Sequence, residues 1–178
     1  MPPPPVARSR LLDAFIQILI DQGERSATLE AVAAAAGVSK GGLLYHFASK
    51  DALVDALARH VEQLGAADAQ AMRTAPEGPA VYYVRTSNYE DTALDRAIVA
   101  TTRLSQGADP RARQALHTLR DGWLQAMTAE IPDPTTAQTI MLIGDGLYYN
   151  AANTGVRSVA TDDEVTDLLA VVHRIISR

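Results

Sequence analysis

The sequence predicts an all-α protein of about nine helices, arranged as an N-terminal three-helix domain (residues 1–50) and a C-terminal helical domain (residues 51–178). Apolar residues recur at helical spacing along the chain, and no segment alternates apolar and polar residues as a half-buried strand does. Proline and glycine separate the periodic segments. The composition agrees, because Ala, Leu, Val and Ile are plentiful whereas aromatic residues make up only 5% of the chain.

The first helix is expected from about Arg8 to Gln22, with Gly23 ending it. Its apolar face consists of residues at helical spacing: Leu11, Leu12, Phe15, Ile18 and Leu19. The prolines before it, residues 2–5, are expected to form a short extended arm.

Residues 28–50, TLEAVAAAAGVSKGGLLYHFASK, predict two short helices joined by a tight turn. Thr28 can cap the first helix and Ser39 the second, because a hydroxyl oxygen at this position accepts a hydrogen bond from a free amide. Gly37 lies where the first helix must stop and the chain must turn through positive φ. Four apolar residues are spaced to pack the two helices together: Val32, Val38, Leu43 and Phe47. This order is typical of a helix-turn-helix, which sets a short helix into the DNA major groove.

Gly41 and Gly42 lie in the first turn of the second short helix, where each costs roughly 0.5–1 kcal/mol relative to Ala. Glycine is favoured there if the backbone comes very near a phosphate or a base edge; the alternative is a frayed helix start with no partner. The first interpretation is favoured by the polar residues around them, all able to donate hydrogen bonds: Ser39, Lys40, Tyr45, His46 and Lys50.

These residues resemble the TetR/AcrR family of bacterial repressors, whose members have a Thr-capped helix, an Ala-Gly-Val-Ser turn and a Gly-x-Leu-Tyr-x-His-Phe recognition helix. The matching residues are Thr28, Ala36-Gly37-Val38-Ser39, Gly41, Leu43, His46-Phe47 and Ser49-Lys50. The sequence departs at Leu44, where many members have Tyr, and has Tyr45 one position later. Whether Tyr45 takes over the usual phosphate contact or reads a base edge is left open.

The resemblance implies a set of residues at the DNA: Thr28, Ser39, Lys40, Gly41, Gly42, Tyr45, His46 and Lys50. Lys50 and Thr28 should meet phosphates, as helix N-termini do. The chain is acidic overall, at −5, but residues 1–50 hold five Lys/Arg against four acids and residues 51–178 hold eleven against seventeen. The recognition segment 39–50 holds two lysines and no acid, which gives the local basic face that phosphate contact requires.

Ser49 is expected to cap a fourth helix that joins both domains, as it does in the family. Its apolar stripe is Leu53, Leu57, Val61 and Leu64. The later prolines and glycines delimit further helices at about residues 79–87, 91–106, 110–130, 134–153 and 162–177.

The last two predicted helices carry wide apolar faces, which need a cover. In the first the face is Ile140, Ile143, Gly144, Leu147 and Ala151; in the second it is Val165, Leu168, Leu169, Val172 and Ile176, widened by Val171 and Ile175. In the family these helices form a four-helix bundle with their copies in a second subunit, which implies a homodimer on a palindromic DNA operator. The alternative is that they pack on their own domain.

The second domain offers candidates for a small-molecule effector pocket, with aromatic walls and a few polar groups: Tyr82, Tyr83, His117, Trp123, Asp145, Tyr148 and Tyr149. Asp145 is unusual, because it lies in the apolar segment IMLIGDGLYYN and a carboxylate there is costly unless it is paired or needed. One alternative is that Asp145 is a counter-charge for a cationic or hydrogen-bonding ligand, which the Tyr and Trp residues suggest is aromatic. The other is that it has a partner within the protein, in an ion pair with Arg120 or Arg103 or in a polar contact across the dimer.

The favoured function is therefore a ligand-responsive repressor, released from DNA by a small-molecule effector. A DNA-binding activator or an architectural helical protein without an effector ranks second. An enzyme ranks last, because the sequence lacks a G-x-S-x-G elbow, a Walker-type loop and histidines at metal spacing, so no cofactor or metal is expected.

A cytoplasmic protein that contacts no membrane is expected from three observations. There is no cysteine, no segment approaches the roughly 20 apolar residues of a membrane span, and the start MPPPPVARSR lacks the apolar core of a secretory signal.

Overall fold

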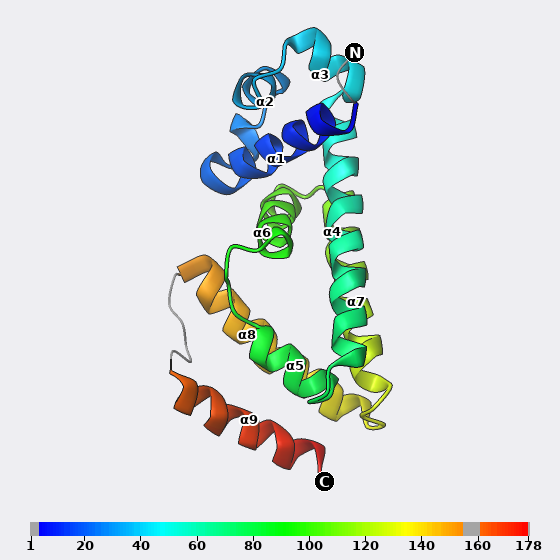
Figure 1. Cartoon of the computed structure of the whole chain (residues 1–178), viewed down its shortest axis with the longest axis vertical. Coiled ribbons are helices and arrows are strands. Elements are labelled where there is room, and N and C mark those ends of the chain that lie inside the picture. Colours follow the sequence, from blue (N-terminus) through cyan, green and yellow to red (C-terminus); the bar gives the residue numbers. More distant parts are fainter. Residues whose placement is uncertain (1–3, 155–160, 178) are drawn as a thin grey trace. The chain divides into compact units, whose positions relative to one another are not determined.

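A computed structural model describes residues 4–154 and 161–177, and all the regular secondary structure in these ranges is helical (Figure 1). The elements are α1 (Pro4–Gln22), the 3-10 turn η1 (Glu24–Ser26), α2 (Leu29–Ala35), α3 (Lys40–His46), α4 (Lys50–Thr74), α5 (Pro79–Thr86), α6 (Ala93–Gln106), α7 (Pro110–Thr128), α8 (Pro134–Thr154) and α9 (Asp162–Ile176). The nine α-helices in the described part of the chain confirm the predicted all-α fold.

Most helix ends lie within about two residues of their predicted positions, because local chemistry determines them. Ser49, for example, caps α4 as expected, since its Oγ accepts a hydrogen bond from the Ala52 amide at 3.2 Å. The extended proline arm is the exception, because α1 already begins at Pro4. Proline is tolerated in the first turn of a helix, where its missing N–H has no partner to lose. Residues 1–3 of the expected arm lie outside the described residues.

The chain divides into two compact units, one formed by residues 1–64 with 93–118 and the other by residues 65–92 with 119–178. The helices α4 and α7 are continuous and contribute residues to both units. The domain boundary predicted between residues 50 and 51 lies at the start of α4. That this boundary separates a DNA-binding from an effector-binding domain stays a prediction. No helix in the described ranges is long and apolar enough to cross a membrane.

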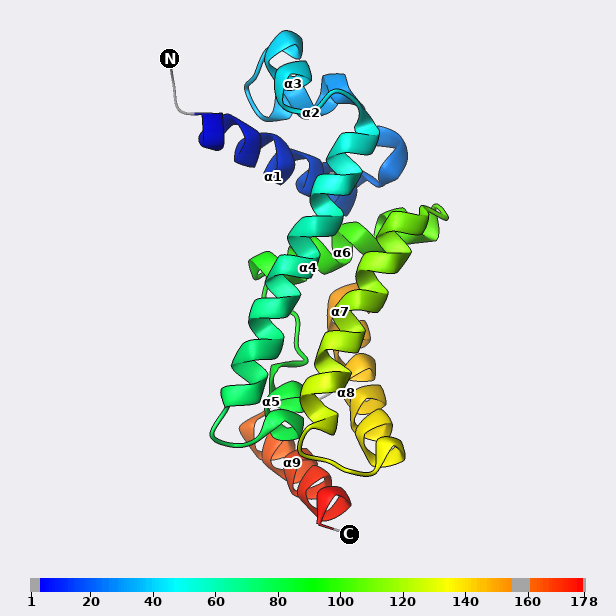
Figure 2. The same ribbon diagram turned by 90° about the vertical axis from the view of Figure 1, so that its right-hand side faces the viewer.

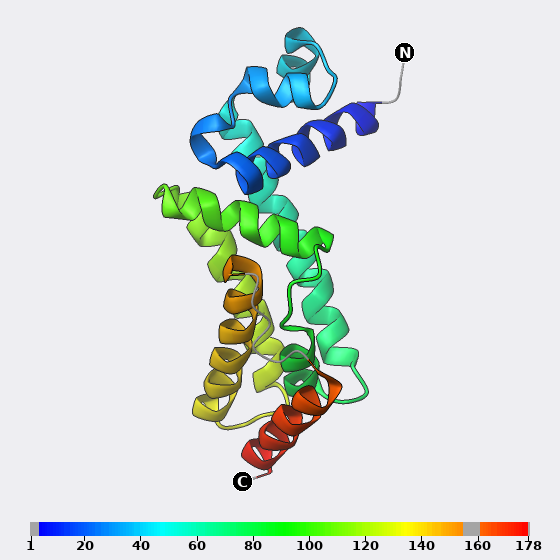
Figure 3. The same ribbon diagram turned by 90° about the vertical axis from the view of Figure 1, so that its left-hand side faces the viewer.

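In the first unit, α1 packs against α2 on one side and α6 on the other (Figure 3). The helices α2 and α3 also contact each other. The fully or almost fully buried side chains of α1 to α3, of Phe47 and of the first part of α4 include Leu11, Phe15, Leu19, Val32, Leu43, Phe47, Leu53 and Leu57. Of the four residues predicted to pack the two short helices together, Val32, Leu43 and Phe47 are buried, and Val38 is half-buried.

In the second unit, α5 packs against both α8 and α9 (Figure 2). Its core gathers apolar side chains from the later parts of α4 and α7 together with α5, α8 and α9: Met72, Tyr83, Met127, Ile140, Met141 and Val172. Gly65 of α4 lies directly against the side chain of Leu119 of α7, so these two helices approach closely there.

Most of the apolar residues on the faces predicted to meet a second subunit are buried or half-buried within the second unit. Ile140 and Val172 are fully buried in its core, and Gly144 lies so close to the ring of Tyr83 that a Cβ would clash. Ile143, Leu147, Leu168, Leu169 and Ile175 pack against the same core. Two residues of the predicted face of α9, Val171 and Ile176, are exposed, and α8 exposes two large apolar side chains outside its predicted face, Leu142 and Tyr149.

Candidate nucleic-acid interface

The helix-turn-helix is fixed by two hydroxyl caps and one glycine. Thr28 Oγ1 accepts a hydrogen bond from the Ala31 amide at 3.1 Å, and Ser39 Oγ accepts one from the Gly42 amide at 3.1 Å. Gly37 has φ +64°, the left-handed conformation that glycine adopts at little cost. All three roles were predicted and are confirmed. Because each hydroxyl still has its own hydrogen to donate, capping leaves Thr28 and Ser39 able to bind a phosphate oxygen.

The helix α3 buries one face and exposes the opposite one. Leu43 is fully buried, whereas Leu44 is 43% exposed and Tyr45 is 79% exposed. The Tyr45 ring meets the ring of the half-buried His46 edge-on, with the centroids 5.1 Å apart. The exposed face of α3 is therefore dominated by Leu44 and Tyr45, next to the bare backbone of Gly41.

Gly41 and Gly42 have different surroundings. A Cβ on Gly42 would lie 2.8 Å from Val38 Cγ1 and 3.2 Å from Ser39 Oγ, so any larger residue at this position would have to displace these side chains. A Cβ on Gly41 would have no atom within 4 Å. The glycine at position 42 is therefore explained by close contacts within the protein. Gly41 has no such contacts, so at this position there is space for DNA to approach the backbone.

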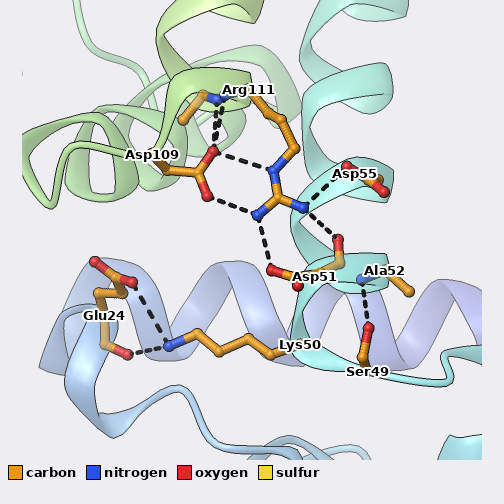
Figure 4. A network of polar contacts seen from close by, with 9 residues as sticks. Glu24, Ser49, Lys50, Asp51, Ala52, Asp55, Asp109 and Arg111 are labelled. Carbon is orange, nitrogen blue, oxygen red and sulfur yellow. Dashed lines mark hydrogen bonds and ion pairs between the residues drawn. The ribbon is translucent and has the colours of Figure 1, made fainter.

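Both lysines of the segment 39–50 have carboxylate neighbours. Lys40 Nζ lies 2.6 Å from Glu30 Oε1, and this hydrogen bond lowers the pKa of Glu30. Lys50 Nζ donates to the backbone oxygen of Glu24 at 2.9 Å and lies 3.8 Å from Glu24 Oε1 (Figure 4). Counting charges along the segment missed these pairs, because the acids lie 10 and 26 residues before their lysines.

A cluster of charges beside Lys50 joins the start of α4 to the start of α7 (Figure 4). The Arg111 guanidinium bonds Asp109, at 2.7 Å, and Asp51, at 2.8 Å, and lies 3.3 Å from Asp55 Oδ1. The hydrogen bonds to Asp109 and Asp51 raise the pKa of Arg111, and the bond from Arg111 lowers the pKa of Asp109. This cluster, which the sequence did not reveal, holds the N-terminal turn of α4 in place.

In the second unit, Asp145 is paired within the chain. Its Oδ2 accepts a hydrogen bond from Arg120 at 2.9 Å, and its Oδ1 accepts one from the Tyr83 hydroxyl at 2.7 Å. Burial and the nearby Asp145 carboxylate raise the pKa of Tyr83. Of the alternatives left open for Asp145, the internal ion pair is present, and Arg120 is the partner.

The other effector candidates do not all gather at one place. Tyr82 and Trp123 both donate hydrogen bonds to the carboxylate of Asp68, at 3.0 and 2.8 Å. Asp68 was not predicted from the sequence as part of a site. Tyr148 is half-buried and Tyr149 is 63% exposed on α8. His117 is exposed and belongs to the other compact unit. A hollow elsewhere in the second unit is lined by Val84, Arg85, Ser87, Asn88, Leu147, Val165 and Leu168.

Two family models match the chain. Residues 11–57 match the model for bacterial regulatory proteins of the tetR family, and residues 77–173 match the tetracyclin repressor-like C-terminal domain. The chain belongs to the TetR family. It is therefore a DNA-binding transcriptional regulator and not an enzyme, and its helix-turn-helix is the DNA-binding element.

Individual relatives agree with the family assignment. The transcriptional regulator BetI of Burkholderia thailandensis is 31% identical over 99 residues, which cover 54% of this chain and 51% of that protein. BetI of Burkholderia mallei is 30% identical with the same coverage. The chain thus aligns with about half the length of these curated relatives.

Solved structures share the whole fold. The multidrug binding protein EbrR complexed with malachite green has a TM-score of 0.73 at 24% identity, covering 95% of this chain and 97% of that one. A TetR-family member from Streptomyces coelicolor A3 has a TM-score of 0.73 at 24% identity, covering 96% and 98%.

Proposed function

We propose that this TetR-family regulator is a ligand-responsive repressor. In this proposal a homodimer binds a palindromic operator through α3 of each subunit, and a small-molecule effector bound to the second unit releases it. The observation that carries the proposal is the capped α3, which exposes Gly41, Leu44 and Tyr45 while its other face is buried. Such a helix is rigid enough to be placed in a major groove and has side chains to use there.

The proposed DNA-contacting residues are Thr28, Ser39, Lys40, Gly41, Gly42, Tyr45, His46 and Lys50. Thr28 and Ser39 support this role because their capping leaves a hydroxyl hydrogen available to a phosphate. Lys40 and Lys50 would have to exchange Glu30 and Glu24 for phosphate oxygens. Since exposed ion pairs contribute only about 0–1 kcal/mol, this exchange is not costly.

The homodimer is supported by apolar residues that α8 and α9 leave on the surface. Leu142 is 60% and Tyr149 63% exposed, and Val171 and Ile176 add to the exposed apolar area. A two-fold dimer also supplies the two copies of α3 that a palindrome requires. Sedimentation velocity at micromolar concentration tests this step: we expect a dimer for the wild type and a monomer for Leu142→Asp, and a monomeric wild type would refute it.

The proposed effector is an aromatic cation. EbrR has been solved with malachite green and with ethidium, and both compounds are aromatic cations. The second unit of this chain offers the matching chemistry, because rings and carboxylates both attract positive charge. The proposed effector residues are those of the predicted set that belong to the second unit: Tyr82, Trp123, Asp145, Tyr148 and Tyr149.

Selection from randomised double-stranded DNA with the full-length protein tests the proposal. We expect an enriched palindrome, and we expect Tyr45→Ala to weaken binding to it. Malachite green and ethidium are then titrated into the complex, and either compound should lower operator affinity by linkage. If a palindrome is enriched but neither cation lowers affinity, the effector proposal fails. A DNA-binding activator without an effector then becomes the better description.

A further inference from the structure

Two large apolar side chains stand exposed on α3. These are Leu44 and Tyr45, and the described part of the first unit exposes one further large apolar side chain, Val6 of α1. Tyr45 has a hydroxyl that can bond a phosphate or a base edge, but Leu44 has no polar atom. Its role on a DNA-binding helix must therefore rest on apolar contact.

On the surface of α3, the neighbours of Leu44 in the preceding turn are a charged side chain and a glycine. Lys40, one turn earlier on α3, is paired with Glu30, and Gly41, three residues earlier, has no side chain. Residues three and four apart are neighbours on a helix surface. The missing Cβ of Gly41 leaves open space beside Leu44, so a base edge can reach this side chain without displacing another one.

We propose that Leu44 reads the 5-methyl group of a thymine in each half-site of the operator. The inference rests on the proposed function, in which α3 is the helix that enters the major groove. The thymine methyl is the apolar group that a base pair presents in that groove, whereas the other groups there are hydrogen-bond donors and acceptors. A leucine placed over a donor or acceptor would remove it from water without replacing its hydrogen bond, which is unfavourable. A leucine placed over a thymine methyl gains buried apolar area instead.

The test replaces each operator thymine, one at a time, by deoxyuracil, which pairs in the same way and lacks only the methyl group. Affinity of the full-length protein is measured by fluorescence anisotropy at one fixed salt concentration. Burying one methyl group corresponds to about a fourfold change in affinity. We therefore expect one thymine in each half-site to show about a fourfold loss on conversion to deoxyuracil.

Two variants identify the side chain that is responsible. In Leu44→Ala the penalty at that thymine should disappear, while in Tyr45→Ala it should persist although overall affinity falls. Thermal melting checks that both variants fold, which is expected because Tyr45 is 79% and Leu44 43% exposed.

The possible failures are distinguishable. If an operator is selected but no thymine responds, or if the penalty persists in Leu44→Ala, the inference about Leu44 is overturned and the proposed function stands. If the penalty disappears only in Tyr45→Ala, the methyl group is read by Tyr45 and the inference is also overturned. If selection enriches no sequence at all, the proposed function fails and the inference fails with it.

Discussion

The neighbouring glycines of α3 should respond in opposite directions to substitution by alanine. A Cβ on Gly41 meets no atom within 4 Å, so Gly41→Ala gains only helix propensity. The free protein should become more stable by about 0.5–1 kcal/mol. A Cβ on Gly42 would lie 2.8 Å from Val38 Cγ1 and 3.2 Å from Ser39 Oγ, and this overpacking costs roughly 1–3 kcal/mol. After the same propensity gain, Gly42→Ala should destabilise by up to about 2.5 kcal/mol.

Urea denaturation followed by far-UV circular dichroism, at one protein concentration for all variants, measures both changes. Val38→Ala is the matched second variant, because it removes the Cγ1 that the new Cβ would meet. In that background Gly42→Ala should cost clearly less than it does alone, which is the coupling expected of residues in contact. A Gly41→Ala protein that is less stable than wild type, or a Gly42→Ala protein as stable as Gly41→Ala, would refute the reasoning.

Gly41→Ala should change stability and DNA binding in opposite directions. Gly41→Ala should bind the operator more weakly even though the protein is more stable, because the added methyl group fills the space through which a base edge or phosphate approaches. Operator titrations at one salt concentration measure this. An unchanged affinity would mean that DNA does not come close to the backbone at Gly41.

Three further predictions concern charges. Glu30→Gln should raise operator affinity and steepen its salt dependence, because Lys40 is released, whereas Asp13→Asn, an exposed acid elsewhere on the first unit, should have the smaller effect in the same titrations. Lys50→Ala should reduce the slope of log K against log salt by about one unit, and an unchanged slope in footprints at two salt concentrations removes this lysine from the contact set. Asp145→Asn should lower the melting temperature, and if malachite green stabilises wild type and variant equally, the role of Asp145 is structural only.

Features that depend on residues close together in the chain are predictable from the sequence. The caps at Thr28 and Ser39 act on amides three residues later, and Gly37 acts through its own φ. Helix ends were predictable for the same reason. The ion pair between Lys40 and Glu30 joins residues 10 apart on two different helices, and no spacing rule reveals such a pair.

In the second unit, side-chain placement was harder to predict from the sequence. The helix α8 is apolar around most of its circumference, so helical periodicity cannot choose which side turns inward. Ile140 and Gly144 pack inside, and Leu142 and Tyr149 are exposed. Asp68, whose partners Tyr82 and Trp123 lie 14 and 55 residues later, was missed because only the folded chain brings these residues together.

The paired lysines bear on how the proposed repressor would gain specificity. Non-specific binding to DNA comes almost entirely from phosphate contacts, and here Lys40 and Lys50 already have carboxylate partners. Because the segment 39–50 holds only these two lysines, each recognition helix would hold arbitrary DNA weakly. Base contacts from Leu44 and Tyr45 depend on the DNA sequence, so they would raise the ratio of specific to non-specific affinity. With little affinity available to a single subunit, operator binding would require both subunits at the correct half-site spacing. A small molecule that favours another spacing would then be enough to release the DNA.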